Sequence, residues 1–426
     1  MLHSLARSGS PHSPLGGVRT TLPPDLATEG NQVHKHHRIF CVVGARPNMM
    51  KMAPLLRAMK KDGDIEAILI HTGQHYDYSM SKVLFEQLEM PDPDYNLEVG
   101  SGTHHAQTAK VMERFGEVVQ KDRPDLIVVV GDVNSSMACA LVGAKEQIPV
   151  AHVEAGLRSF DRTMPEEINR VVTDAVSELL FITEESARTN LRTEGVPDEK
   201  IHFVGNVMID SLVKVLSAAQ KSDLGNKLGL NPGRYIVLTL HRPSNVDDPE
   251  QLRRTLDTIA CIARELPVVF SVHPRTAAKI AASGFDRIRP ISNDQKVQAA
   301  GIWTLPPVNY IEFLGLVDSA HMVITDSGGV QEETTYLGVP CLTYRDNTER
   351  PATITYGTNR LIGVDAETLL QKAHELIASS PVRRAAGTVA PPFWDGKASD
   401  RIVPVLKYFL DNLRQPVLPG DNSTRL

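Results

Sequence analysis

The sequence predicts an α/β protein with two doubly wound parallel sheets. At 426 residues the chain is too long for one comfortable core and suits two domains. From Arg38 onward, short runs rich in β-branched residues alternate with helical patterns. These runs are apolar almost throughout, which is typical of parallel strands covered on both faces, because burial on one face alone would produce alternation. We therefore expect two Rossmann-like domains with the active site in the cleft between them.

Two series of apolar runs are the predicted strands. In the first domain they are residues 38–43, 66–70, 125–130, 148–152, 179–183 and 202–204, and in the second they are residues 235–240, 267–272, 302–305, 321–325 and 339–344. The first domain is expected to comprise residues 36–206, and the second residues 207–395. A closing helix within residues 396–414 could pack on either domain and is assigned to the first.

Composition and chain ends exclude several classes of protein. A net charge of −6 gives no electrostatic case for binding nucleic acid or an anionic membrane, and no apolar run approaches the roughly 20 residues of a membrane helix. Residues 1–35 lack the apolar centre of a signal peptide and are expected to be a disordered extension, with residues 415–426 a flexible tail. The cysteines are far apart without a CxxC pair, so we expect free thiols in the reducing cytoplasm; they are Cys41, Cys139, Cys261 and Cys341.

Cations follow several strands, where ligands bind in an open parallel sheet. Arg46 and Lys51 lie in GARPNMMK, at the start of a helix, where a positive charge opposes the helix dipole. An anionic ligand would resolve that conflict, whereas surface or salt-bridge roles are the alternative. His241 in TLHRPSN ends the first strand of the second domain beside an arginine, and Arg350 in TERP follows its last predicted strand.

The segment ITDSGGVQEE predicts a phosphate-binding helix start. Ser327, Gly328 and Gly329 open a helix whose free N–H groups can hold a phosphate, although the glycines alone are also compatible with a simple turn. Glu333 is a candidate for binding a ribose diol, with a solvated helix face as the alternative. Neither a Walker loop nor GxGxxG is present, so a nucleoside triphosphate or nicotinamide cofactor is poorly supported.

Carboxylates gather at the strand ends of the first domain. Asp132 follows one buried strand, where it could instead cap the helix that begins near Asn134, and Glu154 is expected just past the next strand. Glu166 and Glu167 follow a proline, as at an ordinary helix N-terminus. Cations in one domain and acids in the other suit a nucleotide diphosphate whose attached group meets acid/base residues. No metal is expected, because HTGQH has no clustered ligand set beside it.

The ordered motifs resemble one known family, the non-hydrolysing UDP-N-acetylglucosamine 2-epimerases, over about residues 38–413. The motifs are GARPxxxK, TGQH, GDVNS, HVEAGLR, MPEEINR, VGNVMID, LHRPSN, TDSGGVQEE and NTERPATITYGTNRL. The resemblance implies the GT-B arrangement, in which the second domain binds UDP. It implies conversion of UDP-N-acetylglucosamine to UDP-N-acetylmannosamine with no nicotinamide or metal cofactor. The enzyme is expected to be a cytoplasmic homodimer.

The resemblance also assigns roles to residues. It implies that UDP or its sugar is held by Arg46, Lys51, His241, Ser327, Gly328, Gly329, Glu333 and Arg350, and that the catalytic residues are Asp132, Glu154, Glu166 and His241. The C2 proton of the sugar has no adjacent carbonyl to acidify it, so anti elimination of UDP to 2-acetamidoglucal, followed by re-addition, is the expected route. Cations stabilise the leaving UDP, and carboxylates move the proton.

Three positions depart from the commonest family pattern. Asn48 replaces a frequent glutamate, Ser244 interrupts an HRxEN-type motif, and Asp77 stands where a second glutamine is often found, near a segment that binds an activating substrate in some members. A modified substrate such as UDP-2,3-diacetamido-glucuronate is therefore an alternative. A hydrolysing epimerase, a GT-B glycosyltransferase and an inactive nucleotide-sugar sensor are further alternatives.

Overall fold

The computed structural model describes residues 36–74, 85–291, 296–297, 300–305, 308–379 and 390–413. The extension predicted at residues 1–35 and the tail predicted at residues 415–426 lie outside these ranges.

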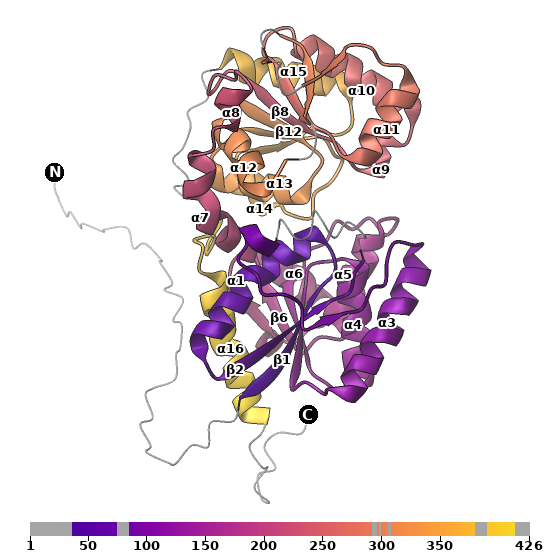
Figure 1. Cartoon of the computed structure of the whole chain (residues 1–426), viewed down its shortest axis with the longest axis vertical. Helices are drawn as coiled ribbons and strands as arrows, with labels where there is room; N and C mark the ends of the chain where they lie inside the picture. Colours follow the sequence, from indigo (N-terminus) through magenta and orange to yellow (C-terminus); the bar gives the residue numbers. More distant parts are fainter. Residues whose placement is uncertain are drawn as a thin grey trace, which may run out of the picture. The chain divides into compact units, whose positions relative to one another are not determined.

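The first sheet has the order β3-β2-β1-β4-β5-β6-β7, and its neighbouring strands are parallel (Figure 1). Its strands are β1 (His37–Val43), β2 (Ile65–His71), β3 (Tyr95–Asn96), β4 (Leu126–Val130), β5 (Val150–Ala155), β6 (Leu179–Ile182) and β7 (Ile201–Phe203). Its helices are α1 (Arg46–Asp62), α3 (His104–Lys121), α4 (Asn134–Lys145), α5 (Pro165–Ala175) and α6 (Glu185–Thr193), and a 3₁₀ turn spans Asp198–Lys200.

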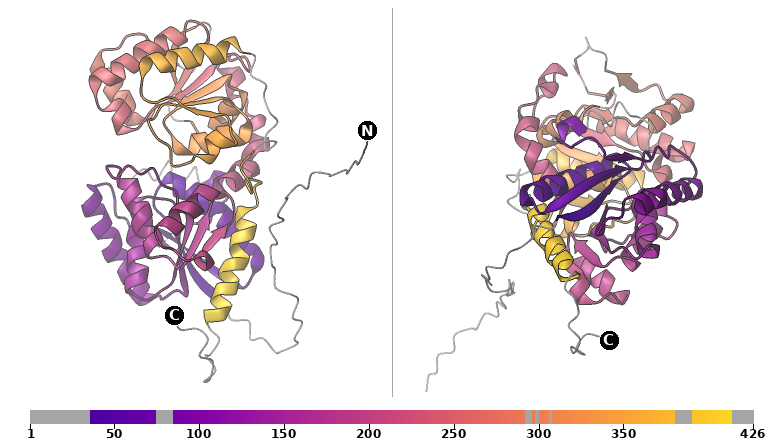
Figure 2. Two further views of the ribbon diagram at one scale, coloured as in Figure 1. Left: turned by 180° about the vertical axis from the view of Figure 1, so that it is seen from behind. Right: turned by 60° about the horizontal axis from the view of Figure 1, so that its bottom comes forward.

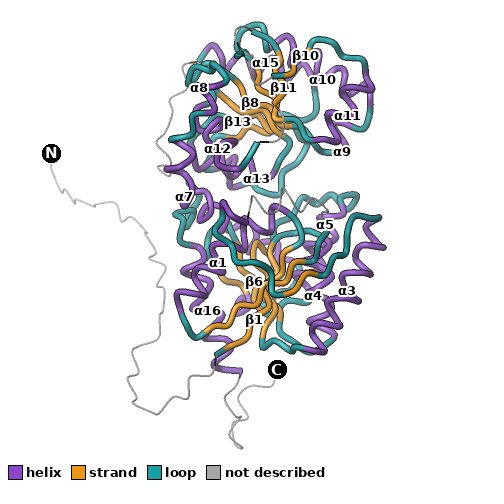
Figure 3. The backbone as a smooth tube through the Cα atoms, viewed as in Figure 1, coloured by secondary structure: helices purple, strands orange, loops and turns teal. Residues whose placement is uncertain are grey.

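The second sheet has the order β10-β11-β9-β8-β12-β13-β14 and is also parallel. Its strands are β8 (Ile236–Thr239), β9 (Val268–Ser271), β10 (Ile288–Pro290), β11 (Ile302–Leu305), β12 (Met322–Thr325), β13 (Cys341–Thr343) and β14 (Asn359–Leu361). The helices are α8 (Leu224–Lys227), α9 (Pro243–Val246), α10 (Pro249–Ile262), α11 (Pro274–Ser283), α12 (Tyr310–Ser319), α13 (Gly328–Leu337), α14 (Ala352–Thr355) and α15 (Ala366–Ala378). Figure 3 shows strands flanked by helices in each sheet.

Burial on both faces explains the unbroken apolar runs. In β1, Ile39 and Cys41 pack in a core with α1, whereas Phe40 and Val42 pack in another core with Phe115 of α3. Successive side chains of a strand point to opposite faces, so every position of a two-sided strand needs an apolar residue. The predicted doubly wound α/β class is confirmed.

Both sheets place a topological switch point beside the predicted motifs. In the first sheet the strand order reverses between β1 and β4, and in the second it reverses between β8 and β12. Ligands of open α/β sheets bind outside the carboxyl ends of the strands at such a point. The four segments that follow these strands are 44–46, 131–133, 240–242 and 326–327, which belong to the motifs singled out from the sequence.

The helix α16 (Ala398–Leu413) returns to the first sheet. It packs beside α1, as Figures 1 and 2 show, and His37 Nε2 lies 2.7 Å from Asp411 Oδ1. The helix α7 (Val207–Gln220) contacts α1 as well as α12 and α13, so it links the two sheets. The domain limits drawn from the sequence stay predictions.

Two further predictions concern the chain as a whole. All four cysteines are free, and three are buried, while Cys261 is partly exposed. Among the described residues, no helix is both long and apolar enough to cross a membrane.

Candidate active site

The carboxylate of Glu154 lies at the centre of the candidate site. The sequence predicted this residue just past a strand, which is wrong: it lies within β5, where the register shifts between Val153 and Ala155. This bulge and a φ of 75° turn the backbone out of its regular pleat, which is how bulges re-aim side chains next to active sites. The predicted strand ended at His152, because an acid in an apolar run resembles a strand end.

Two cations hold one oxygen of this carboxylate. Lys51 Nζ donates to Glu154 Oε1 at 2.7 Å, and Arg350 Nη2 donates to the same oxygen at 3.1 Å. Glu154 is only 2% exposed, and its Oε2 has no partner among the described protein atoms. A buried carboxylate oxygen left without a partner is costly unless a ligand or a proton occupies it. Glu154 therefore has one carboxylate oxygen that a ligand or a proton could occupy.

Arg350 joins the two halves of the site. It precedes α14 and contacts Glu154 of β5, while its Nε donates to Glu332 Oε1 of α13 at 2.6 Å and its Nη1 donates to Glu349. Burial would lower the pKa of this guanidinium, but Glu332 and Glu349 raise it well above its ordinary value. The cation predicted to bind UDP is therefore already paired with carboxylates, so direct contact with a ligand would require an exchange of partners.

Asp132 pairs with an arginine that the sequence analysis did not select. Its Oδ2 lies 2.5 Å from Arg170 Nη1. The residue before α4 is Val133, so the suggestion that Asp132 caps that helix is wrong. The Asp132 side chain is 23% exposed. Desolvation would raise the pKa of Asp132, but the charges of Arg170 and Lys51 outweigh it and lower the pKa.

The helix α5 buries polar residues against the ends of β4 and β5. Glu167 accepts hydrogen bonds from the backbone N–H groups of Ser159 and Phe160 and from Arg170, so it fixes the loop before the helix. Glu166, the predicted acid/base residue, is exposed in the first turn. The spacing of Glu167 and Arg170, three residues apart, could have indicated an ion pair on one helix face.

His241 is oriented by a buried aspartate. Its Nδ1 lies 2.8 Å from Asp326 Oδ1, and Asp326 Oδ2 also accepts from the backbone N–H groups of His241 and Arg242. Burial would raise the pKa of Asp326, but the hydrogen bond from His241 and the other donors lower it. The His241 side chain is 45% exposed, so its second ring nitrogen is accessible to a ligand. Asp326 was not predicted as a site residue, because the DSGG motif was interpreted only through the residues that open the helix.

The helix start predicted at the DSGG segment is present, whereas phosphate binding there stays a prediction. Ser327 is the N-cap of α13, and Gly328 and Gly329 are its first two residues. A Cβ added at Gly328 would lie 2.5 Å from Arg350 Nη1, so this position is glycine because the guanidinium packs against it. At Gly329 an added Cβ would meet only Met208 Cε, at 3.9 Å. The open space over the helix start suits a group that approaches the backbone closely.

Glu333 is buried, so its interpretation as a solvated surface residue is wrong. It is 4% exposed, and its Oε2 and the nearby Tyr310 hydroxyl have no hydrogen-bond partner of ordinary geometry. Burial raises the pKa of Glu333 to about 7, although the charge of Arg46 opposes this shift. Arg46 itself is exposed at the first position of α1.

Some predicted features lie elsewhere. His75 and Asp77 are outside the described residues. Among the described residues, no group of three or more His, Cys, Asp or Glu side chains could hold a metal ion. Asn48 is buried and forms hydrogen bonds with backbone groups. Its Oδ1 accepts from the N–H groups of Gly44 and Ala45, and its Nδ2 donates to the Val130 carbonyl oxygen at 2.6 Å. Ser244 is exposed.

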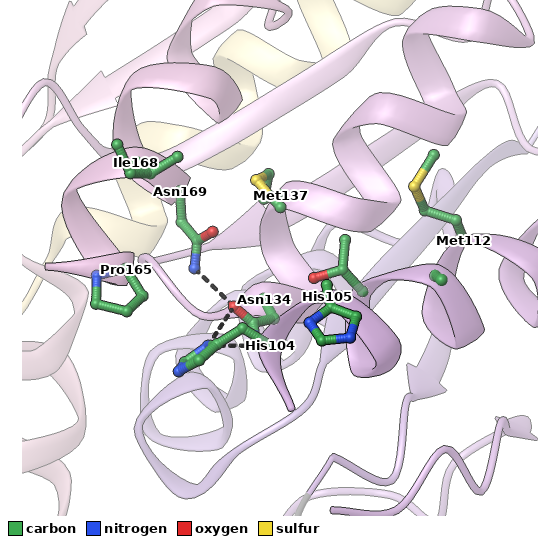
Figure 4. Close-up of a pocket in the computed structure, with 10 residues that line it drawn as sticks. His104, His105, Met112, Asn134, Met137, Pro165, Ile168 and Asn169 are labelled. Carbon is green, nitrogen blue, oxygen red and sulfur yellow. Dashed lines mark hydrogen bonds between the residues drawn. The ribbon is translucent and has the colours of Figure 1, made fainter. Parts of the chain in front are cut away.

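A separate cavity of about 520 Å³ lies among α3, α4 and α5 (Figure 4). Its lining is largely apolar, with Met112, Met137 and Ile168. Asn169 and Asn134 contact each other in it, as the figure shows, and Asn169 also donates to the Asp132 carbonyl oxygen at 2.9 Å. The cavity contains none of the predicted site residues, but it adjoins the loop that carries Asp132.

Comparison with known proteins identifies the family. The family model described as UDP-N-acetylglucosamine 2-epimerase matches residues 57–407. This chain belongs to the UDP-N-acetylglucosamine 2-epimerase family. A UDP-N-acetylglucosamine 2-epimerase of Methanocaldococcus jannaschii is 42% identical over 377 residues, covering 87% of this chain and 99% of its own.

Two further comparisons involve relatives whose names carry different UDP-sugars. The crystal structure of the M. jannaschii protein in complex with UDP-GlcNAc and UDP matches with a TM-score of 0.77 at 41% identity, covering 87% of this chain and 99% of that chain. A UDP-2,3-diacetamido-2,3-dideoxy-D-glucuronate 2-epimerase of Pseudomonas aeruginosa is 39% identical over 339 residues, covering 79% of this chain and 91% of its own. The fold is therefore that of the GT-B epimerases, and the chain is an enzyme of this family.

Proposed function

We propose that this enzyme is a non-hydrolysing epimerase that interconverts UDP-N-acetylglucosamine and UDP-N-acetylmannosamine. The observation that carries the proposal is the buried Glu154, which has one oxygen held by Lys51 and Arg350 and the other without a partner. Such a carboxylate can exchange a proton with a sugar carbon beside a leaving nucleotide. The M. jannaschii relative, whose structure contains UDP-GlcNAc and UDP, supports the choice of substrate.

Groups from both sheets would hold UDP, most of them from the second sheet. The start of α13 at Ser327, Gly328 and Gly329 offers backbone N–H groups to a phosphate, and the exposed Arg46 and His241 add charge and a hydrogen-bond donor. Glu333 would accept from the ribose hydroxyls. These donors stabilise the negative charge that grows on UDP as its bond to the sugar breaks.

Elimination and re-addition then conserve every atom. A carboxylate takes the C2 proton, the C–H electron pair forms the C1–C2 double bond, and the C1–O pair leaves with UDP. UDP then adds back to C1 while C2 is protonated from the opposite face, so two acid/base groups are needed. The buried Glu154 and the partly exposed Asp132 are candidates, and the exposed Glu166 would act from the first turn of α5. A buried site keeps water from the glucal intermediate.

Turnover in deuterated water tests the proposal. Epimerisation should place deuterium at C2 of the sugar, which proton NMR detects directly. Free N-acetylmannosamine would indicate a hydrolysing enzyme, and turnover that requires an acceptor would indicate a glycosyltransferase. An enzyme that leaves the substrate unlabelled at C2 contradicts the proposal.

The sugar specificity needs a separate assay, because relatives at 42% and 39% identity carry names with different substrates. Competition between UDP-GlcNAc and UDP-2,3-diacetamido-glucuronate, measured as the ratio of kcat/KM values, should favour UDP-GlcNAc. A ratio in favour of the glucuronate would replace the substrate in the proposal and leave its chemistry intact. The cytoplasmic homodimer remains part of the proposal, and sedimentation velocity tests the dimer.

A further inference from the structure

The buried histidine His152 contacts only hydrogen-bond acceptors. It lies in β5, two residues before Glu154, and is fully buried. Its Nδ1 lies 2.6 Å from Asp174 Oδ1 of α5, and its Nε2 lies 3.1 Å from the carbonyl oxygen of Gly131, which follows β4. Carbonyl and carboxylate oxygens only accept, and a neutral imidazole carries a single N–H. Both contacts are hydrogen bonds only when the ring is an imidazolium.

The surroundings of the ring balance this charge. Asp174 is buried, and its Oδ2 lies 2.7 Å from Arg158 Nη1 and accepts from the Gly156 N–H at 3.0 Å. Burial would raise the pKa of Asp174, but His152 and Arg158 lower it, so the carboxyl stays ionised and does not itself donate to the ring. Arg158 pairs in turn with Glu194 at 2.6 Å. Two cations and two anions therefore alternate in a row that is buried from His152 to Arg158 and reaches the surface at Glu194.

The Gly131 carbonyl, which His152 contacts, belongs to a loop beside Lys51 and Asp132. Gly131 has a φ of 63°, and its N–H donates to the Val153 carbonyl at 2.9 Å. An added Cβ here would lie 2.8 Å from Lys51 Nζ, the cation that holds Glu154. Asp132 is the next residue. The loop is thus held between Lys51 on one side and the His152 ring on the other.

We propose that His152 is a positioning residue for the reaction: a buried imidazolium that fixes the Gly131 carbonyl and so sets the placement of Asp132 and Lys51 against Glu154. This inference rests on the proposed function, because it assigns His152 a task in that chemistry. It does not touch the substrate. Small displacements of reacting groups lower rates by orders of magnitude, so loss of this contact should change turnover more than stability.

Two substitutions separate the two contacts of the ring. In His152→Gln the longer amide can reach the Gly131 carbonyl as Nε2 does, whereas in His152→Asn the shorter amide can reach only Asp174. We expect His152→Asn to lower kcat for UDP-GlcNAc by on the order of 10-fold to 10²-fold with KM little changed, while His152→Gln keeps most of the turnover at similar thermal stability. His202→Asn is the matched control, since this half-buried ring on β7 packs against Phe181.

Equal losses in both His152 variants, or losses that follow the folded fraction, would overturn the positioning role. The protonation state is tested in the wild-type enzyme with ¹⁵N-labelled histidine at neutral pH. Both nitrogens of His152 should carry protons, whereas His202, whose pKa is lowered by burial, supplies the neutral reference. A neutral His152 in an enzyme that epimerises overturns this inference alone. An enzyme that places no solvent deuterium at C2 overturns the proposed function and the role in it.

Discussion

The carboxyl edges of the two sheets bind charge in different ways. At the first edge the acids are paired with basic side chains, Asp132 with Arg170 and Glu154 with Lys51. At the second edge Asp326 is held mainly by backbone N–H groups and His241, and α13 presents its own N–H groups beyond Ser327. The first edge is suited to moving protons between compensated charges. The second is suited to receiving an anion that the protein does not supply.

The sharpest way to break this comparison is Glu154→Gln. The amide keeps the shape of the side chain but cannot take a proton, so kcat should fall on the order of 10³-fold, equivalent to about 4 kcal/mol of activation free energy. UDP affinity, measured by calorimetry, should change little because most of the groups proposed to hold UDP lie at the second edge. Near-native turnover would remove Glu154 from the mechanism, and a large loss of UDP affinity would show that the two edges are not separate.

Arg350→Met should be next in size. This change leaves Glu154, Glu332 and Glu349 buried without their shared cation, which should lower the free energy of unfolding by about 3 kcal/mol or more. Chemical denaturation measures the loss. Arg170→Met is the matched change within the first edge. It should destabilise less, because its partner Asp132 is 23% exposed and its buried partner Glu167 keeps the backbone N–H groups of Ser159 and Phe160. An equal loss in the two variants would mean that the link between the edges adds no stability.

The sequence predicted the two sheets and their central strands better than the contacts of individual side chains. Each predicted strand is present, and all but β7 are central strands, whose burial on both faces gives unbroken apolar runs. The strands it missed, β3, β10 and β14, are all edge strands. An edge strand pairs on one side only and is short here, and Arg289 in β10 or Arg360 in β14 gives no apolar pattern.

The candidate site shows the same limit. The motifs located Asp132, Glu154 and the start of α13, but the pairs of Arg170 with Asp132 and of Asp326 with His241 join residues far apart in the sequence. A partner such as Asp132 for Arg170, 38 residues earlier, is visible only after the chain has folded. Asn48 is the converse case, since a departure that suggested altered specificity is a buried residue bonded to the backbone.

Two buried acids, one at each edge, should make the free energy of unfolding depend on pH. Burial raises the pKa of Glu333 to about 7 and that of Glu184, after β6, to about 7, from 4.5 in each case. Between pH 4.5 and about 7 these two acids are protonated in the folded protein but ionised in the unfolded chain. The free energy of unfolding should therefore fall as pH rises through this range and level off above it. Glu333→Gln should remove part of this pH-dependent loss of stability, on the order of 3 kcal/mol over the whole range.

The pH dependence of UDP affinity should distinguish Glu333 from Glu184. A ribose diol that donates to ionised Glu333 should make UDP bind more tightly as pH rises through about 7, and Glu333→Gln should abolish this trend. Glu184→Gln should alter the stability slope but not the trend in UDP affinity, because Glu184 contacts Ser186 and the Ala352 N–H. Calorimetric titrations at several pH values measure both. A trend that survives Glu333→Gln would place the ribose elsewhere.

The smallest expected effect distinguishes the two glycines that open α13. At Gly329 an added methyl group meets open space, so Gly329→Ala should leave the melting temperature unchanged or slightly higher, since alanine favours helix. If phosphate approaches the backbone there, the same methyl group should weaken UDP binding about tenfold, or about 1.4 kcal/mol. Gly328→Ala is the contrasting variant, because its methyl group would displace Arg350 and so disturb the carboxylates of both edges. Unchanged UDP affinity in Gly329→Ala would mean that the anion binds away from the helix start, and the second edge would then lose its part in the comparison.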